Sequence, residues 1–241
     1  MSGLADSPVD LDAEMGELWR SMGAAPPGRA KAVLFAAAAA GEGVSTIARE
    51  FAFWAARRAS RRVWLVDMDL GLSPQASIIA AQSARYGPLG PPSVASPNGA
   101  VFFAVEPPLR RPDGRPWPDN RYLAAHAVGS HALWVTSFRR EALRANQSVR
   151  IAPAGEYWQA LRRHADLVVV DAPSLQRSDA AVTQARFMDE IVLVVAADQV
   201  DIAGPARLRE ALEAAGGRVS GLFHNREAIE VPKFLSAIRR R

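Results

Sequence analysis

The sequence has no cysteine and no long apolar run. Without cysteine the chain cannot form disulfides, use thiolate chemistry or bind zinc through Cys ligands. No apolar stretch approaches the roughly 20 residues that a membrane-spanning helix needs. The opening MSGLADSPVDLDAEM has no basic segment followed by an apolar one, so we expect no secretory signal. Together these absences favour a cytoplasmic protein.

Lysine is nearly absent, so arginine carries almost all of the positive charge. The only lysines are Lys31 and Lys233, and the formal net charge is +4. Arginines cluster at 57–62 and at 239–241, and we interpret these clusters as a solvated helix end and a solvated tail. Since no aromatic residues are interleaved with a basic stripe, we expect no nucleic-acid partner.

The sequence offers little for metal binding through histidine or for acyl transfer. No two histidines have the i, i+4 spacing of a helical ligand pair; they are His126, His131, His164 and His224. No Gly-x-Ser-x-Gly elbow is present to supply a serine nucleophile. Both kinds of site are therefore excluded as first hypotheses.

Apolar runs that alternate with helical patterns predict an α/β fold. Short apolar runs are typical of buried parallel strands, and here they fall at 32–37, 63–67, 100–105, 132–136, 167–171, 191–196 and 219–223. Apolar residues at three- and four-residue spacing predict helices at 44–59, 155–164, 179–188 and 203–215. This alternation predicts a doubly wound, mostly parallel sheet with helices on both faces.

Two regions interrupt the alternation and define the predicted domain organisation. Residues 1–28 are predicted to form an N-terminal arm, with DAEMGELWRSMG as a short amphipathic helix and AAPPG as a hinge. Residues 29–241 are predicted to form the α/β domain. Within it, most of the proline and glycine falls in 83–120, which we expect to be loops around one strand.

Polar residues gather where three predicted strands end. The small-residue turn AAAAAGEGVST follows the first strand, and Asp67, Asp69 and Asp171 lie at or just past the ends of two others. Since ligands of open α/β sheets bind at the carboxyl ends of the strands, we expect these residues to form one site.

These motifs resemble those of the deviant-Walker P-loop ATPases. Within that superfamily they are most similar to the motifs of the bacterial tyrosine kinases that control capsule and exopolysaccharide chain length. GEGVST is similar to the loop GEGKST, VWLVDMDL to the second acidic motif, and LVVVDAP to the Walker B strand. RVSGLFHNREAIEVPKFL resembles the closing strand, and Glu17-x-x-Arg20 resembles part of the ring-forming helix. The resemblance extends from about residue 14 to 238 and is poor at 83–150.

The resemblance implies roles for particular residues if the site is intact. Loop residues would hold the nucleotide phosphates and Asn225 would face adenine; the loop residues are Gly41, Glu42, Gly43, Val44, Ser45 and Thr46. Ser45, Asp69 and Asp171 would hold Mg²⁺. Asp67 would be the catalytic acid that orients the attacking group.

Departures from the family pattern argue against strong catalysis. Val44 stands where the family has its phosphate-binding lysine, and Gly71 and Gly23 replace arginines of the second acidic motif and the ring-forming helix. We expect no replacement from Lys31, at the other end of its strand, or from Arg49, more than a turn along the helix. The family's tyrosine-rich tail is also missing, because the chain ends IRRR and its tyrosines are Tyr86, Tyr122 and Tyr157.

The missing lysine affects binding and chemistry unequally. One charged hydrogen bond to phosphate contributes about 1.5–3 kcal/mol to binding. A cation that stabilises the transition state can contribute about 10³- to 10⁵-fold in rate. We therefore expect binding of ATP and Mg²⁺ to be weak or absent, and hydrolysis to suffer more than binding.

Three functions follow from these observations. The preferred one is a kinase-like pseudoenzyme that regulates or assembles bacterial exopolysaccharide or capsule export. The resemblance implies that a chain-length-determinant membrane protein would be its partner and would recruit it to the inner membrane. The alternatives are an active ATP-dependent tyrosine kinase or ATPase, and a positioning ATPase of the partition and division-site type. Homo-oligomerisation is left open, because half of the ring motif is missing.

Overall fold

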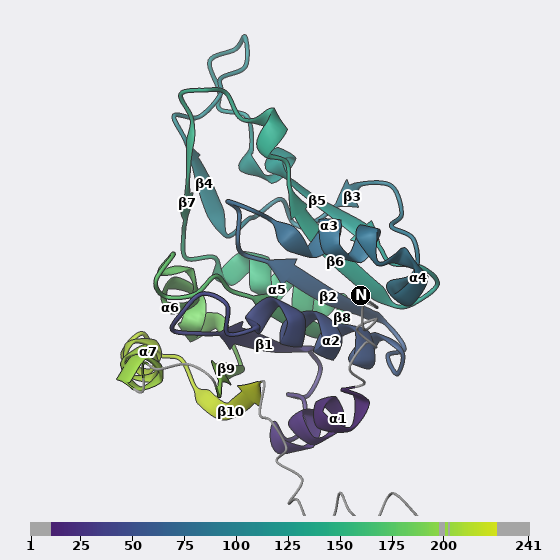
Figure 1. Cartoon of the computed structure of the whole chain (residues 1–241). Helices are drawn as coiled ribbons and strands as arrows, with labels where there is room; N and C mark the ends of the chain where they lie inside the picture. Colours follow the sequence, from purple (N-terminus) through teal and green to yellow (C-terminus); the bar gives the residue numbers. More distant parts are fainter. Residues whose placement is uncertain (1–10, 198–200, 202, 226–241) are drawn as a thin grey trace, which may run out of the picture.

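The protein has an eight-stranded, mostly parallel sheet with helices on both faces (Figure 1), as predicted. The computed structural model describes residues 11–197, 201 and 203–225. The main sheet has the order β10-β9-β1-β8-β2-β6-β5-β3, and β4 and β7 form a separate pair. The strands are β1 (Lys31–Ala36), β2 (Arg62–Asp67), β3 (Ser93–Val94), β4 (Phe103–Glu106), β5 (Leu123–Ala127), β6 (Leu133–Phe138), β7 (Ser148–Ile151), β8 (Ala165–Asp171), β9 (Glu190–Ala196) and β10 (Val219–Asn225). The helices are α1 (Asp12–Ser21), α2 (Val44–Ala56), α3 (Pro74–Ala81), α4 (Ser83–Tyr86), α5 (Gly155–Arg163), α6 (Ala180–Gln184) and α7 (Ala203–Ala214).

The central strands are mostly apolar because both of their faces are covered. Along β1, Val33 and Phe35 join one core cluster, whereas Ala32 and Leu34 join the other. Helices α1, α2 and α3 contribute to the first cluster, and α5, α6 and α7 contribute to the second. Residues alternate between the two faces of a strand, so a strand buried on both sides shows no polar alternation.

Residues 83–120 were expected to be loops around one strand, and the structure shows α4, β3 and β4 in this range. The strand expected at 100–105 is β4, which lies outside the main sheet and pairs antiparallel with β7 (Figure 1). β5 and β3 extend the main sheet as antiparallel strands beyond β6. The prolines that follow β4, Pro107 and Pro108, lack the N–H groups that a longer ladder would need.

The predicted short helix of the arm is present as α1 and packs on α2. Met15 and Leu18 are buried in the same cluster as Phe51 and Trp54. Residues 1–10 lie outside the described part of the chain, and the division into an arm and a domain stays a prediction. In the described segments, no helix is both long and apolar enough to pass through a lipid bilayer.

The strand order places the ends of β1, β2 and β8 together. β8 pairs parallel with both β1 and β2, and β9 pairs with the other side of β1. The sheet is therefore extended on both sides of β1, by β8 and β2 on one side and by β9 and β10 on the other. The loops after β1 and β8 border the crevice where sheets of this kind bind ligands.

Candidate functional site

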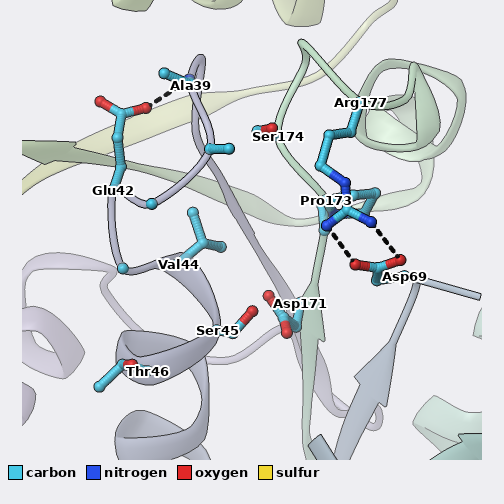
Figure 2. A pocket seen from close by; sticks show the side chains of 14 residues that line it. Ala39, Glu42, Val44, Ser45, Thr46, Asp69, Asp171, Pro173, Ser174 and Arg177 are labelled. Carbon is cyan, nitrogen blue, oxygen red and sulfur yellow. Dashed lines mark hydrogen bonds and ion pairs between the residues drawn. The ribbon is translucent and has the colours of Figure 1, made fainter. Parts of the chain in front are cut away.

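A cavity of ≈ 330 Å³ opens at this edge of the sheet (Figure 2). It is lined by the loop after β1, the start of α2, Asp69 after β2, and the end of β8 with its following loop. In Figure 2 the β1 loop lies on one side of the cavity, Arg177 and Asp69 lie on the other, and Ser45 and Asp171 lie between them. The structure thus brings most of the predicted site residues together.

The loop after β1 is shaped by two glycines and a buried carboxylate. Gly41 and Gly43 have φ of 85° and 94°, values that favour glycine because it has no Cβ. The Glu42 side chain is 2% exposed, and its Oε2 accepts a hydrogen bond from Ala39 N at 2.7 Å. This hydrogen bond between Glu42 and Ala39 therefore stabilises the conformation of the loop. Because α2 begins at Val44, the positive end of the helix dipole faces the cavity.

Asn225 lies against the loop rather than in the cavity lining. Its Nδ2 donates a hydrogen bond to the backbone oxygen of Glu42 at 2.9 Å. A Cβ on Gly43 would come within 2.0 Å of that Nδ2, so only glycine allows this approach. The role toward adenine stays a prediction, and the observed contact joins the end of β10 to the loop after β1.

The two strand-end aspartates differ in what their oxygens contact. Asp67 does not line the cavity; its Oδ1 accepts a hydrogen bond from Asp69 N at 2.9 Å and its Oδ2 accepts one from Gln75 N at 3.0 Å. Asp171 lines the cavity, its Oδ2 accepts a hydrogen bond from Gln75 Nε2 at 2.6 Å, and its Oδ1 has no hydrogen-bond partner within the described residues. The catalytic role of Asp67 and the metal-binding role of Asp171 both stay predictions, and of the two residues only Asp171 lines the cavity.

Burial changes the acidity of both carboxyl groups. It raises the pKa of Asp171 to about 6, and it raises the pKa of Asp67 well above its ordinary value, with a further contribution from the nearby Asp171 charge. The two residues are in register across the β2–β8 ladder. Two ionised carboxylates at this position would repel each other in a medium of low polarity.

The raised pKa of Asp171 gives a testable pH dependence of stability. The folded protein holds this proton more tightly than the unfolded chain does. The resulting stabilisation is therefore complete below about pH 4 and is lost as the pH rises through about 6. Asp171→Asn keeps an acceptor for Gln75 but carries no charge, so we expect the variant to be more stable than the wild type above pH 7, by up to about 3 kcal/mol. Urea unfolding from pH 4 to pH 8 measures this difference. If the free energy of unfolding changes with pH equally in the two proteins, the pKa of Asp171 is not raised in the folded state.

Asp69 forms an ion pair with Arg177, a residue that lies outside the sequence motifs. The Arg177 guanidinium contacts both carboxylate oxygens of Asp69 at 2.7 and 3.2 Å, and Leu72 N donates to Oδ1 at 3.1 Å. The sequence feature that could have identified Arg177 is its position in the loop that follows Asp171 at the end of β8. Gln75 was also missed, although its side chain is fully buried and joins Asp171 to the backbone oxygen of Ser45.

The residues present fit a nucleotide with its magnesium better than a metal ion alone. Among the described residues, no three His, Asp or Glu side chains come together as a metal site. Mg²⁺ in nucleotide sites uses one or two carboxylates together with phosphate oxygens and water. The unpaired Asp171 Oδ1, Ser45 and the loop amides are compatible with such a ligand, although Val44 supplies no charge.

Solved structures with the same fold include kinase-related and nucleotide-binding proteins. The chimerical protein CapA2B2 aligns with a TM-score of 0.59 at 17% identity, over 92% of this chain and 86% of that one. The kinase domain of the Escherichia coli tyrosine kinase ETK aligns with a TM-score of 0.57 at 15% identity, over 96% and 84% of the two chains. A nucleotide-binding protein from Archaeoglobus fulgidus in complex with ADP aligns with a TM-score of 0.50 at 15% identity, over 92% and 74%. No protein-family model and no curated protein matches the chain. At these identities the likeness establishes the fold alone, a mostly parallel sheet with helices on both faces.

Proposed function

We propose that this protein is a kinase-like, nucleotide-binding regulator or assembly component of bacterial exopolysaccharide or capsule export, with weak or absent hydrolysis. The observation that carries the proposal is a cavity that has the loop, Ser45 and Asp171 of a phosphate site but Val44 in place of its lysine. This combination favours binding over chemistry.

Binding is supported by the lining of the cavity. The loop and the first turn of α2 present backbone N–H groups and a positive helix end to phosphates. Ser45, Asp69 and Asp171 would hold Mg²⁺, which neutralises phosphate charge when it is bound. The desolvated Asp171 Oδ1 gains a partner when such a ligand enters.

Weak or absent hydrolysis is supported by two features of the same site. Val44 removes a charge worth about 10³- to 10⁵-fold when a cation stabilises phosphoryl transfer. The Asp67 carboxylate does not line the cavity, and both of its oxygens accept backbone hydrogen bonds, so it is poorly placed to orient an attacking group.

The link to polysaccharide export rests on the motif resemblance and on the fold shared with the ETK kinase domain. In this proposal the protein would act at the inner membrane through a chain-length-determinant protein. Glu17 and Arg20 lie on the exposed side of α1, whose other side packs on α2. These exposed residues are available for that partner or for a second copy of the chain.

Calorimetric titration with ATP·Mg²⁺ and a phosphate-release assay on the same preparation test the nucleotide part of the proposal. We expect saturable binding to the wild type, weaker binding to Asp171→Ala, and phosphate release close to the background rate. Turnover that is well above background and is lost in both Asp69→Ala and Asp171→Ala would instead establish the active kinase or ATPase. No binding at all would refute nucleotide recognition.

Capture from solubilised bacterial membranes tests the proposed partner. We expect the wild-type protein to retain a chain-length-determinant protein, and Glu17→Arg combined with Arg20→Glu to retain less of it. A double variant that still folds and captures as much partner as the wild type would exclude this side of α1 as the docking surface.

A further inference from the structure

We infer that Arg177 supplies the phosphate-directed charge that Val44 lacks, and that Asp69 holds this arginine until a nucleotide arrives. This inference rests on the proposed nucleotide binding and specifies how the same site would recognise its ligand. The cavity is lined by more acidic than basic side chains. Of the described residues that line it, Glu42, Asp69 and Asp171 are acidic and Arg177 is the single basic one.

Arg177 is positioned by the phosphate-binding loop itself. Leu175 N donates a hydrogen bond to Ala37 O at 3.0 Å, and Gln176 N donates to Ala38 O at 3.3 Å. The side-chain oxygen of Gln176 in turn accepts a hydrogen bond from Ala40 N at 3.3 Å. The backbone next to Arg177 is therefore attached to the loop that would hold the phosphates, so the arginine keeps its position relative to them.

The guanidinium end of this pair faces solvent, whereas the carboxylate end is largely buried. The Arg177 side chain is 43% exposed and the Asp69 side chain 12%, and within the described part of the chain Asp69 is the single side-chain acceptor of Arg177. Arg177 can therefore turn toward the solvent or a ligand, while Asp69 keeps the Leu72 N–H donor and needs a second positive partner. Gly71 keeps this approach open, because a Cβ at that position would lie only 3.3 Å from Asp69 Oδ1.

A nucleotide with bound metal provides a partner for each member of the pair. Its phosphates are acceptors that match the two N–H donors of an arginine, whereas its metal matches a carboxylate. Binding would therefore exchange one ion pair for two favourable contacts, with Arg177 on phosphate and Asp69 on the metal. Without metal, Asp69 instead competes with phosphate for the same guanidinium.

A double-mutant cycle measured by calorimetry, with ADP and with pyrophosphate as probes, tests this exchange. In Mg²⁺, Arg177→Ala should weaken ADP binding by about 10- to 100-fold, as for loss of a charged hydrogen bond. In EDTA, Asp69→Ala should tighten ADP binding by about 10-fold, because the competitor for Arg177 is gone. The double variant should show no such gain over Arg177→Ala. Pyrophosphate should follow the same order, since the contact is with phosphate.

Arg140→Ala is the matched control, because Arg140 is an exposed arginine that contacts Gly71 O and does not line the cavity. Thermal melting of each variant separates lost binding from lost folding. The inference is overturned if Arg177→Ala binds ADP as tightly as the wild type, or if the gain from Asp69→Ala persists without Arg177. Both outcomes leave the proposed nucleotide binding intact. A wild-type protein that binds neither probe refutes that proposal, and the inference with it.

Discussion

Replacing Val44 by lysine is expected to tighten ATP·Mg²⁺ binding by about 10- to 100-fold, as for one charged hydrogen bond to phosphate. Val44 is the first residue of α2 and lines the cavity, so a longer side chain can reach into the space beside Ser45. The rate of phosphate release should rise by a larger factor than the affinity, because charge that develops in the transition state gains most from a nearby cation. Calorimetry and a phosphate-release assay measure the two effects separately.

Val44→Met is the control, because it adds a long side chain without charge. We expect it to change neither affinity nor rate by more than a few-fold. If Arg177 already contributes charge, Val44→Lys should improve affinity more in the Arg177→Ala background than in the wild type. Equal behaviour of the methionine and lysine variants would show that the loop does not direct residue 44 toward phosphate.

The sheet could be predicted largely because its central strands are buried on both faces. β1, β8 and β9 are nearly continuous apolar runs, and the structure places all of them within one residue or two of the predicted bounds. The polar ends of these runs also predicted the correct edge of the sheet for the cavity. A strand that is buried on both faces is a short apolar run, so it can be predicted from its own sequence without knowledge of the rest of the fold.

The antiparallel extension could not be predicted in the same way. β5 has the sequence LAAHA, whose alanines favour helices over strands. It is a strand because its backbone pairs with β6, and this pairing depends on where the chain returns to the sheet. The tertiary context therefore overrides the local preference.

The contacts of single side chains in the site also depend on tertiary packing and could not be predicted from the sequence. The sequence placed Asp67 and Asp171 at strand ends, but only the packing shows that Gln75 N and Asp69 N occupy the Asp67 oxygens while one oxygen of Asp171 stays unpaired. The ion pair between Asp69 and Arg177 joins residues 108 positions apart. No spacing rule along the chain identifies such a contact.

Lys31→Met is expected to reduce the free energy of unfolding by about 3 kcal/mol, as for removal of one partner of a buried ion pair. Lys31 is 1% exposed, and its Nζ donates hydrogen bonds to Met22 O at 2.5 Å and Gly23 O at 3.0 Å, just after α1. The same Nζ lies 3.6 Å from Glu190 Oε1. Methionine fills a similar volume but leaves two backbone oxygens and a largely buried carboxylate without this donor.

Lys31→Met should also loosen α1 in the folded protein, because Lys31 joins the end of α1 to the central strand β1. We expect backbone amides of α1 to exchange with deuterium faster in Lys31→Met, while amides of β8 change less, since α1 can detach before the sheet opens. Arg29→Met is the matched control, because Arg29 also pairs with a carboxylate of the same edge, Asp189, but its side chain is 41% exposed. The Asp189 side chain is 14% exposed but keeps Arg162 and Ala32 N as partners when Arg29 is removed, so the loss of this half-exposed arginine should cost about 1 kcal/mol or less. If urea unfolding gives the two variants the same loss of stability, burial of the Lys31 ammonium does not hold the arm in place.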